Sequence, residues 1–171
     1  MEKIKFNNNI VLVGFMGTGK TEVGRILARD FSFEFIDTDD VIEKRLGIKV
    51  PEIFKNYGES YFRDREREVV KDLSELKGLV IATGGGVVMN PENIDDLKKN
   101  GVVICLTATT EEILSRVKEN DDRPLLTVSD KFTKIKELLK SREAFYAKAD
   151  VTIDTTDRDV LEVVKKVKEV L

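Results

Sequence analysis

The segment from Gly14 to Thr21 has the residue types and the spacing that bind the triphosphate of a nucleotide. It reads Gly-Phe-Met-Gly-Thr-Gly-Lys-Thr and fits the pattern G-x-x-x-x-G-K-[ST]. In this pattern the glycines let backbone N–H groups turn inward around phosphate oxygens. Lys20 adds a mobile positive charge, and Thr21 can offer its hydroxyl to Mg²⁺. The alternative is a glycine-rich turn that only joins a strand to a helix.

The residues on either side of this segment predict the elements that would position it. Ile10-Val11-Leu12-Val13 is a short, apolar, largely β-branched run, which indicates a buried strand. The apolar residues that follow the segment, Val23, Ile26, Leu27 and Phe31, recur near helical spacing. The order of strand, glycine loop and helix would place phosphates at a helix N-terminus, where unpaired N–H groups and the helix dipole favour anions.

Five short apolar runs alternate with segments of helical periodicity along the chain. The runs span residues 10–13, 33–36, 79–82, 102–106 and 151–153. Such alternation is typical of a parallel sheet with helices on both faces. We therefore predict an α/β fold, a three-layer sandwich around a five-stranded, mainly parallel sheet.

The length of 171 residues suits one domain with a single core, so we predict one domain over 1–171. Between the second and third predicted strands, about forty residues carry helical periodicity, with Gly47, Pro51 and Gly58 as breaks. One covering helix needs fewer residues, so we predict a helical substrate-binding insert at about 38–73, standing over the glycine loop as a second wall. A loop-like stretch at about 119–130 is the expected lid.

The composition excludes several kinds of chemistry. The chain has no histidine and a single cysteine, Cys105, which excludes imidazole general-base catalysis and a structural zinc site. Its 29 basic and 32 acidic residues are interspersed and give a net charge of −3, which does not favour a nucleic-acid backbone. No apolar run approaches the ~18 residues of a membrane span. We therefore expect a cytoplasmic protein, and a monomer, that binds neither nucleic acid nor membrane.

A cluster of carboxylates follows the second predicted strand. The segment reads Asp37-Thr38-Asp39-Asp40, and ligands of open α/β sheets bind at the carboxyl ends of the strands. Helix capping explains one carboxylate, because Asp40 and Glu43 have the spacing of an N-cap pair. Residues two apart in an extended segment point to the same side, so we expect Asp37 to face a metal ion and Asp39 to meet a substrate hydroxyl.

A run of glycines, Thr83-Gly84-Gly85-Gly86, follows the third predicted strand, again at a carboxyl end. Taken alone, this run indicates no more than a flexible turn, since glycine is the default residue of tight turns. Beside a phosphate-binding loop it favours a surface of backbone N–H groups for a substrate or for a γ-phosphate.

Arginines form the third group of candidates. Arg123 lies beside Pro124 in the predicted lid, from which a cation can reach a transferring phosphoryl group. An arginine in a helix rich in glutamate more simply belongs to a solvated face. Helical geometry therefore does not choose among Arg63, Arg65 and Arg67.

Taken together, these residues resemble the shikimate kinase family of small P-loop kinases, whose fold is related to that of the nucleoside monophosphate kinases. The motifs that carry the resemblance run through nearly the whole chain in the family's order. They are Gly-Phe-Met-Gly-Thr-Gly-Lys-Thr (14–21), Phe-Ile-Asp-Thr-Asp (35–39), Gly-Glu-Ser-Tyr-Phe-Arg (58–63), Ala-Thr-Gly-Gly-Gly-Val-Val (82–88), Arg-Pro-Leu-Leu (123–126) and Arg-Glu-Ala-Phe-Tyr (142–146). The segment after Asp154 departs from the family, because it lacks a proline often found there.

The resemblance implies ATP-dependent phosphorylation of the 3-hydroxyl of shikimate, with Mg²⁺ as cofactor and ATP and shikimate as small-molecule partners. The implied ATP-binding residues are Gly17, Thr18, Gly19, Lys20, Thr21, Arg116, Arg123 and Asp154. The implied metal-binding residues are Thr21 and Asp37, the latter directly or through water. The implied shikimate-binding residues are Asp39, Arg63, Gly84, Gly85, Gly86 and Arg142, and the implied catalytic residues are Lys20, Asp39 and Arg123. The resemblance, and not helical geometry, selects Arg63.

Two other hypotheses are open at the level of sequence. One is a P-loop kinase for another small hydroxylated acid, such as gluconate, or for a nucleotide. The triple-glycine turn, paired with Asp39 and two separated arginines, argues against it. The other is a nucleotide-binding regulator without catalysis, which the intact set of Lys20, Thr21, Asp37, Asp39 and Arg123 disfavours.

Overall fold

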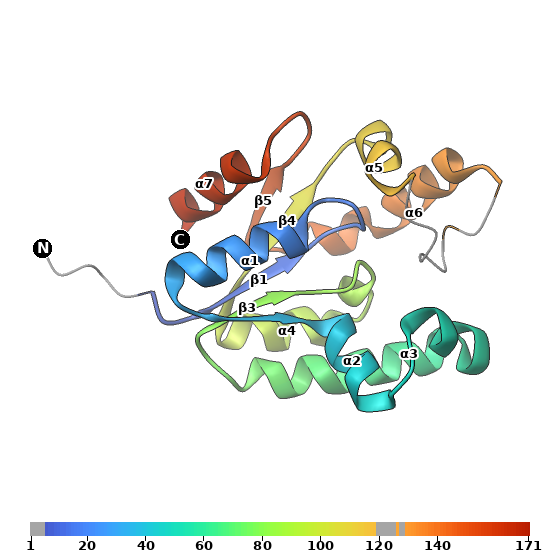
Figure 1. Ribbon diagram of the computed structural model, residues 1–171, viewed down its shortest axis with the longest axis horizontal. Helices are drawn as coiled ribbons and strands as arrows, with labels where there is room; N and C mark the ends of the chain where they lie inside the picture. Colours follow the sequence, from blue (N-terminus) through green and yellow to red (C-terminus); the bar gives the residue numbers. More distant parts are fainter. Residues whose placement is uncertain (1–5, 119–125, 127–128) are drawn as a thin grey trace, which may run out of the picture.

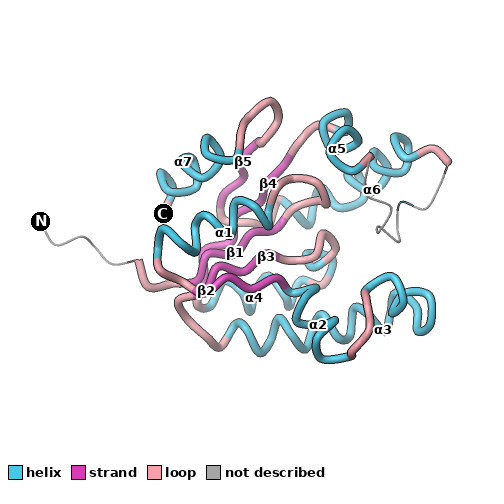
Figure 2. The backbone as a smooth tube through the Cα atoms, in the orientation of Figure 1, coloured by secondary structure: helices cyan, strands magenta, loops and turns pink. Residues whose placement is uncertain are grey.

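A five-stranded parallel sheet forms the centre of the computed structural model, which describes residues 6–118, 126 and 129–171. The strands are β1 (Asn9–Val13), β2 (Glu34–Asp37), β3 (Leu79–Ala82), β4 (Gly101–Thr107) and β5 (Val151–Asp154). They lie side by side in the order β2-β3-β1-β4-β5, and every neighbouring pair is parallel (Figure 2). The predicted sheet is confirmed, with each strand found where an apolar run predicts it.

Helices cover both faces of this sheet (Figure 1). They are α1 (Lys20–Phe31), α2 (Thr38–Leu46), α3 (Val50–Ser74), α4 (Pro91–Lys99), α5 (Thr110–Val117), α6 (Lys131–Tyr146) and α7 (Val160–Val170), with a short 3-10 helix η1 (Val87–Met89). On one face Leu27 of α1 and Val163 of α7 belong to the same apolar cluster as Ile104 of β4. On the other face Val69 of α3 shares a cluster with Val103. Adjacent residues of β4 thus serve opposite layers, as the two-residue period of a strand requires.

The parallel sheet brings three loops to one edge. Because all strands run the same way, their carboxyl ends lie together. The glycine loop follows β1, α2 begins directly after β2, and residues 83–86 follow β3. Since the strand order places β3 between β2 and β1, these three segments are neighbours. In Figure 1, α2 and the first part of α3 extend past this edge of the sheet.

The acid that caps the helix after β2 is not the one that the sequence predicts. Asp37 is the N-cap of α2, because its side chain accepts a hydrogen bond of 2.9 Å from the backbone N–H of Asp39. The prediction that Asp40 caps with Glu43 was wrong, since Asp40 lies inside the first turn and Glu43 accepts a hydrogen bond from the N–H of Val50. Asp39 lies in helix α2, so the prediction that Asp37 and Asp39 belong to one extended segment was wrong as well.

The long crossover between β2 and β3 consists of α2 and α3. Gly47 ends α2 with φ of 71°, and Pro51 lies in the first turn of α3. Gly58 interrupts α3 with φ of 84° and ψ of 171°, so a new helical segment begins after it. All three predicted breaks are therefore confirmed. The role of these helices as a substrate-binding insert stays a prediction.

Most of the predicted lid, residues 119–125 and 127–128, lies outside the described residues. At its near end α5 stops at Val117, and at its far end Asp130 caps α6 by accepting a hydrogen bond from the N–H of Thr133. Leu126, between the two undescribed stretches, is buried in the apolar cluster on the α3 face. Within the described ranges, no helix combines the length and the apolar composition that crossing a membrane requires.

Asn9 fastens the start of β1 to the turn before β3. Its side chain is 1% exposed. The amide donates to the carbonyl of Leu76 at 2.8 Å and accepts from the N–H of Leu79 at 3.0 Å. One buried amide thus forms hydrogen bonds with two backbone groups in the segment between α3 and β3.

We expect Asn9→Ala to lower the free energy of unfolding by about 2–3 kcal/mol, because the backbone groups of Leu76 and Leu79 lose their buried partner. Urea unfolding measures this difference. The matched control is Asn8→Ala, whose side chain is exposed and which should change stability by less than about 0.5 kcal/mol. Equal stabilities of the two variants would contradict the assignment.

Candidate active site

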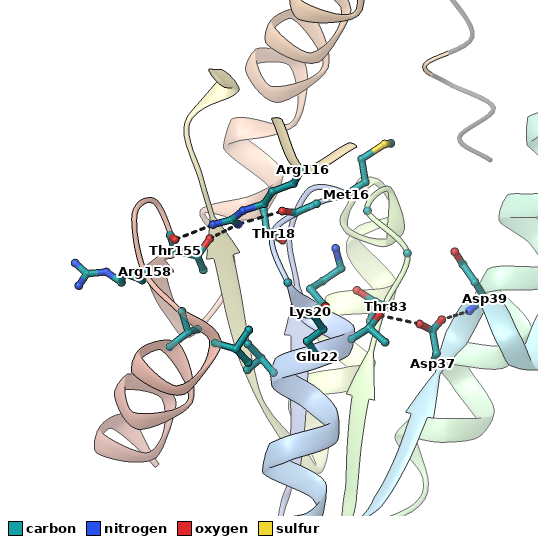
Figure 3. A pocket seen from close by; sticks show the side chains of 18 of the residues that line it. Met16, Thr18, Lys20, Glu22, Asp37, Asp39, Thr83, Arg116, Thr155 and Arg158 are labelled. Carbon is teal, nitrogen blue, oxygen red and sulfur yellow. Dashed lines mark hydrogen bonds between the residues drawn. The ribbon is translucent and has the colours of Figure 1, made fainter. Parts of the chain in front are cut away.

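A cavity of about 600 Å³ opens at the carboxyl ends of β1, β2 and β3. Residues of the glycine loop and of the start of α1 form its floor. In Figure 3, Lys20 and Thr83 lie between Arg116 on one side and Asp37 and Asp39 on the other. The cavity therefore joins the predicted nucleotide site to the acids after β2 and to the glycine turn after β3.

The glycine loop has a backbone conformation that depends on its glycines. Gly14, Gly17 and Gly19 have φ values of 140°, 79° and 91°, a region that other residues rarely adopt. The hydroxyl of Thr18 donates to the carbonyl of Phe15 at 2.7 Å within the loop, and this side chain is buried. The side chain of Thr18 thus holds the loop closed.

Lys20 lies across this loop at the start of α1. Its Nζ donates to the carbonyls of Gly14 and Phe15 at 2.8 and 2.9 Å. The N-cap of α1 is Gly19, which has no side chain to satisfy the first N–H groups of the helix. These N–H groups and the ammonium together form a site suited to phosphate oxygens.

Thr21 and Asp37 offer oxygen atoms to a metal ion beside this site. The hydroxyl of Thr21 is 3.5 Å from Oδ2 of Asp37, and both residues line the cavity. Burial, together with the charge of Asp40, raises the pKa of Asp37 despite the two N–H groups and the Lys20 ammonium that oppose the shift. Mg²⁺ is commonly held by one or two carboxylates with phosphate oxygens and water. A hydroxyl and a partly buried carboxylate side by side therefore fit this ion.

Arg116 forms the opposite wall of the cavity. Its guanidinium donates to the carbonyl of Gly17 at 3.1 Å and to the hydroxyl and carbonyl of Thr155 at 3.0 Å each. The turn after β5 is thereby tied to the glycine loop. Thr155 and Arg158 line the cavity, whereas Asp154 is not part of its lining and accepts a hydrogen bond from the N–H of Thr156.

Two carboxylates press against the first glycine after β3. A Cβ atom on Gly84 would lie 2.9 Å from Oδ1 of Asp39 and 2.9 Å from Oε2 of Glu66. Real Cβ atoms do not approach oxygen so closely, so only glycine allows this arrangement. Glu66 comes from α3 and Asp39 from α2, and the glycine lets both carboxylates reach the same point.

Two arginines press against the next two glycines. A Cβ on Gly86 would overlap the guanidinium of Arg63, and a Cβ on Gly85 would come within 3.5 Å of Nη1 of Arg142. Arg142 is 3% exposed, and this Nη1 has no hydrogen-bond partner among the described residues. Tyr146, one turn along α6, donates its hydroxyl to the carbonyl of Gly85 at 2.6 Å. The second and third glycines of the turn thus lie against guanidinium groups that can receive an anion.

Glu66 is a buried acid within this group. Its side chain is 1% exposed, and Oε1 accepts a hydrogen bond of 2.9 Å from Nη1 of Arg63. Burial raises its pKa to about 7, and the neighbouring charge of Asp39 acts in the same direction, while Arg63 and Arg142 oppose the shift. The carboxyl is therefore poised to titrate near neutral pH.

The chain is similar in sequence and in structure to known kinases. A family model described as shikimate kinase matches residues 16–171. The chain belongs to the shikimate kinase family. It is 55% identical to a shikimate kinase of Thermoanaerobacter pseudethanolicus and 54% identical to one of Caldanaerobacter subterraneus subsp. tengcongensis, in each case over 93% of both chains. A solved shikimate kinase from Acinetobacter baumannii, in complex with shikimate, is 40% identical, with a TM-score of 0.92 over 95% of this chain and 92% of that one.

The family also sets the fold and the enzyme class of the chain, which are those of a P-loop kinase. The predicted site residues fall into two groups around the cavity. Those that line it are Gly17, Thr18, Gly19, Lys20, Thr21, Asp37, Asp39, Gly84, Gly85 and Arg116. Gly86, Arg63 and Arg142 lie together at the glycine turn, and Arg123 lies outside the described residues.

The three arginines that helical geometry could not separate have different partners in this family member. Arg63 faces Gly86 at the turn. Arg65 pairs with Glu68 on its own helix, and Arg67 pairs with Asp96 of α4 at 2.6 Å. Only Arg63 of the three is therefore placed to meet a ligand at the glycine turn.

Thr155 belongs to the segment that the resemblance matches to adenine binding, but three other residues of the site were missed from the sequence. Arg158 follows β5, and the rule that ligands bind at carboxyl ends of strands would have indicated it. Tyr146 lies four residues after Arg142, the spacing of one helical turn, which is a usable signal. Glu66 lies three residues after Arg63 in a charged run, a pattern that equally describes an exposed ion pair.

The raised pKa of Glu66 predicts a pH-dependent stability. In the unfolded chain the carboxyl has its ordinary pKa of 4.5, so its contribution is fully present below that pH and is lost as the pH rises to about 7. Relative to Glu66→Gln, which stays neutral, we expect the free energy of unfolding of the wild type to fall by about 3 kcal/mol between about pH 4 and pH 7. Urea unfolding at each pH measures this difference.

The matched control is Glu68→Gln on the same helix, whose side chain is 53% exposed and pairs with Arg65. Because it keeps Glu66, it should lose stability relative to Glu66→Gln as the pH rises, as the wild type does. A difference between the wild type and Glu66→Gln that is constant with pH would show that Glu66 has an ordinary pKa.

Proposed function

We propose that the chain transfers the γ-phosphoryl group of ATP to the 3-hydroxyl of shikimate. The observation that carries the proposal is the single cavity that joins the glycine loop after β1 to the charged glycine turn after β3. The loop has the form that binds a triphosphate. At the turn Arg63 and Arg142 offer planar guanidinium groups, which suit a carboxylate such as that of shikimate.

The proposed reaction forms one bond and breaks one. The oxygen of the acceptor hydroxyl attacks the γ-phosphorus in line, the bond to the β,γ-bridging oxygen breaks, and ADP leaves with that electron pair. The hydroxyl proton passes to Asp39, or Asp39 only orients the hydroxyl as a hydrogen-bond acceptor. Both roles need a carboxylate that faces the bound hydroxyl, and Asp39 lines the cavity beside Gly84.

Lys20 supplies positive charge where the phosphoryl group transfers. In the proposed mechanism its Nζ exchanges the carbonyls of Gly14 and Phe15 for phosphate oxygens when ATP binds. The donors of the loop and of the N-terminus of α1 are already oriented, so they stabilise the charge without reorganising during the reaction. Positioning and electrostatics therefore supply most of the catalysis.

Thr21 and Asp37 would hold Mg²⁺ at this site. When bound, the ion neutralises charge on the phosphates that carry the transferring group. The proposed role of Arg123, delivered by the lid to the same phosphates, stays a prediction from the resemblance. A contact between Asp154 and adenine, the monomeric state and the cytoplasmic location stay predictions too.

A coupled assay of ADP release tests the proposed function. We expect release to require both ATP and shikimate, and Lys20→Ala to lower kcat by about 10²–10³-fold, because the charge beside the transferring phosphate is lost. Lys165→Ala, an exposed lysine of α7, is the matched control and should leave kcat unchanged. ADP release that does not respond to shikimate, or full turnover in Lys20→Ala, would contradict the proposal.

A second variant tests the acceptor side. We expect Arg142→Lys to raise the KM for shikimate by about 10–100-fold with a smaller change in kcat, because lysine keeps the charge but loses the planar pair of donors. Arg29→Lys is the matched control, since that side chain is 73% exposed on α1. An unchanged KM in Arg142→Lys would remove Arg142 from the proposed carboxylate site.

A further inference from the structure

Four charged side chains surround the glycine turn, and their formal charges cancel when all are ionised. Arg63 and Arg142 are positive, and Asp39 and Glu66 are negative. Charges that leave water need a partner close by, so a balanced set is the least costly one. A fifth charge brought into the set must disturb this balance.

Shikimate would bring such a charge. If its carboxylate binds to Arg63 and Arg142, the four side chains and the bound carboxylate together carry one excess negative charge. Uptake of one proton makes this group of charges neutral again, and a carboxylate of the site can bind that proton. Glu59 also pairs with Arg63, at 3.3 Å, but its side chain is 46% exposed and can keep its charge in water. The two candidates that lie against the glycine turn are Asp39 and Glu66.

The geometry selects Glu66 over Asp39. Asp39 lines the cavity and must stay ionised to orient the acceptor hydroxyl, whereas Glu66 does not line the cavity and is 1% exposed. Glu66 also shares Arg63 with the incoming carboxylate, so it is the acid whose partner the substrate competes for. Its second oxygen, Oε2, is buried without a hydrogen-bond partner among the described residues.

The carboxylate of Asp39 faces the same glycine as Oε2 of Glu66. Oε2 of Glu66 and Oδ1 of Asp39 lie equally close, at 2.9 Å, to the position that a Cβ on Gly84 would occupy. Both carboxylates therefore face the same glycine, and a proton on Glu66 removes one of the two negative charges that meet there. The groups that face Glu66 are Arg63 on its own helix α3, Asp39 of α2 and Arg142 of α6.

We propose that Glu66 takes up a proton when shikimate binds, so that the acceptor pocket stays electrically neutral; this inference rests on the proposed function. Glu66 is here a charge-compensating residue that acts on the substrate through Arg63. Its carboxyl already titrates near neutral pH without substrate, with a pKa of about 7. A further negative charge beside Arg63 shifts it upward again.

Isothermal titration calorimetry of shikimate binding to the full chain measures this proton directly. At a fixed pH the observed enthalpy is compared in phosphate, HEPES and Tris buffers, whose heats of ionisation differ, and the slope gives the number of protons taken up. At pH 8, where most free protein has Glu66 ionised, we expect an uptake of up to about 0.9 proton, and at pH 7 about half a proton. The Kd for shikimate should then rise by up to about tenfold per pH unit above pH 7.5.

Two variants assign the proton. Glu66→Gln mimics the neutral carboxyl, so its slope should be zero and its Kd should be constant from pH 7 to 8.5. Glu68→Gln, the exposed control on the same helix, should keep the uptake of the wild type. The wild-type measurement stands by itself if Glu66→Gln does not fold.

The outcomes separate this inference from the proposed function. Binding of shikimate to the wild type without proton uptake overturns the inference and leaves the proposed function intact. Uptake that persists in Glu66→Gln also overturns it, because another group then holds the proton. A wild-type protein that does not bind shikimate overturns the proposed function and the inference together.

Discussion

Charged side chains from three helices meet at a turn that has no side chains of its own. Asp39 comes from α2, Arg63 and Glu66 come from α3, and Arg142 comes from α6, and each lies against one of the glycines 84–86. A single methyl group at the first or third of these glycines would overlap an acid or a guanidinium. This close approach of charge to bare backbone is the constraint on which the acceptor side of the site depends.

The parallel sheet places this turn beside the glycine loop. Because β3 pairs with β1 on one side and β2 on the other, the segments after these three strands share one edge. The glycine loop and the glycine turn offer different kinds of interaction to a ligand. In the proposed function, the loop before α1 binds phosphate through oriented N–H groups and the ammonium of Lys20. The turn after β3 binds the acceptor through charges of which Glu66 and Arg142 are buried. Removing one partner of a buried ion pair leaves the other uncompensated and costs about 3–5 kcal/mol.

Local signals in the sequence were enough to predict the fold and to name the residues of the glycine loop that line the cavity. Apolar runs separated by helical periodicity predicted the strands. The spacing of the glycine loop, together with the predicted strand before it and helix after it, indicated a phosphate-binding site. Asp40 was misassigned as a cap because two caps fit the same acidic run, and only the backbone shows that Asp37 accepts the N–H of Asp39. Glu66 could not be found from sequence, since its burial depends on which face of α3 meets the turn after β3. That contact joins residues far apart in the chain, and the spacing to Arg63 is the same for an exposed ion pair.

In the proposed function, the charged side chains at the glycine turn hold the carboxylate of the acceptor while the glycine loop holds the phosphates. A crystal structure of the chain with shikimate and ADP tests it most directly. We expect the carboxylate within hydrogen-bond distance of both Arg63 and Arg142, a shikimate hydroxyl at Asp39, and the ADP phosphates at the loop beside Lys20. Shikimate bound with its carboxylate away from both arginines, or ADP bound away from the loop, would contradict it.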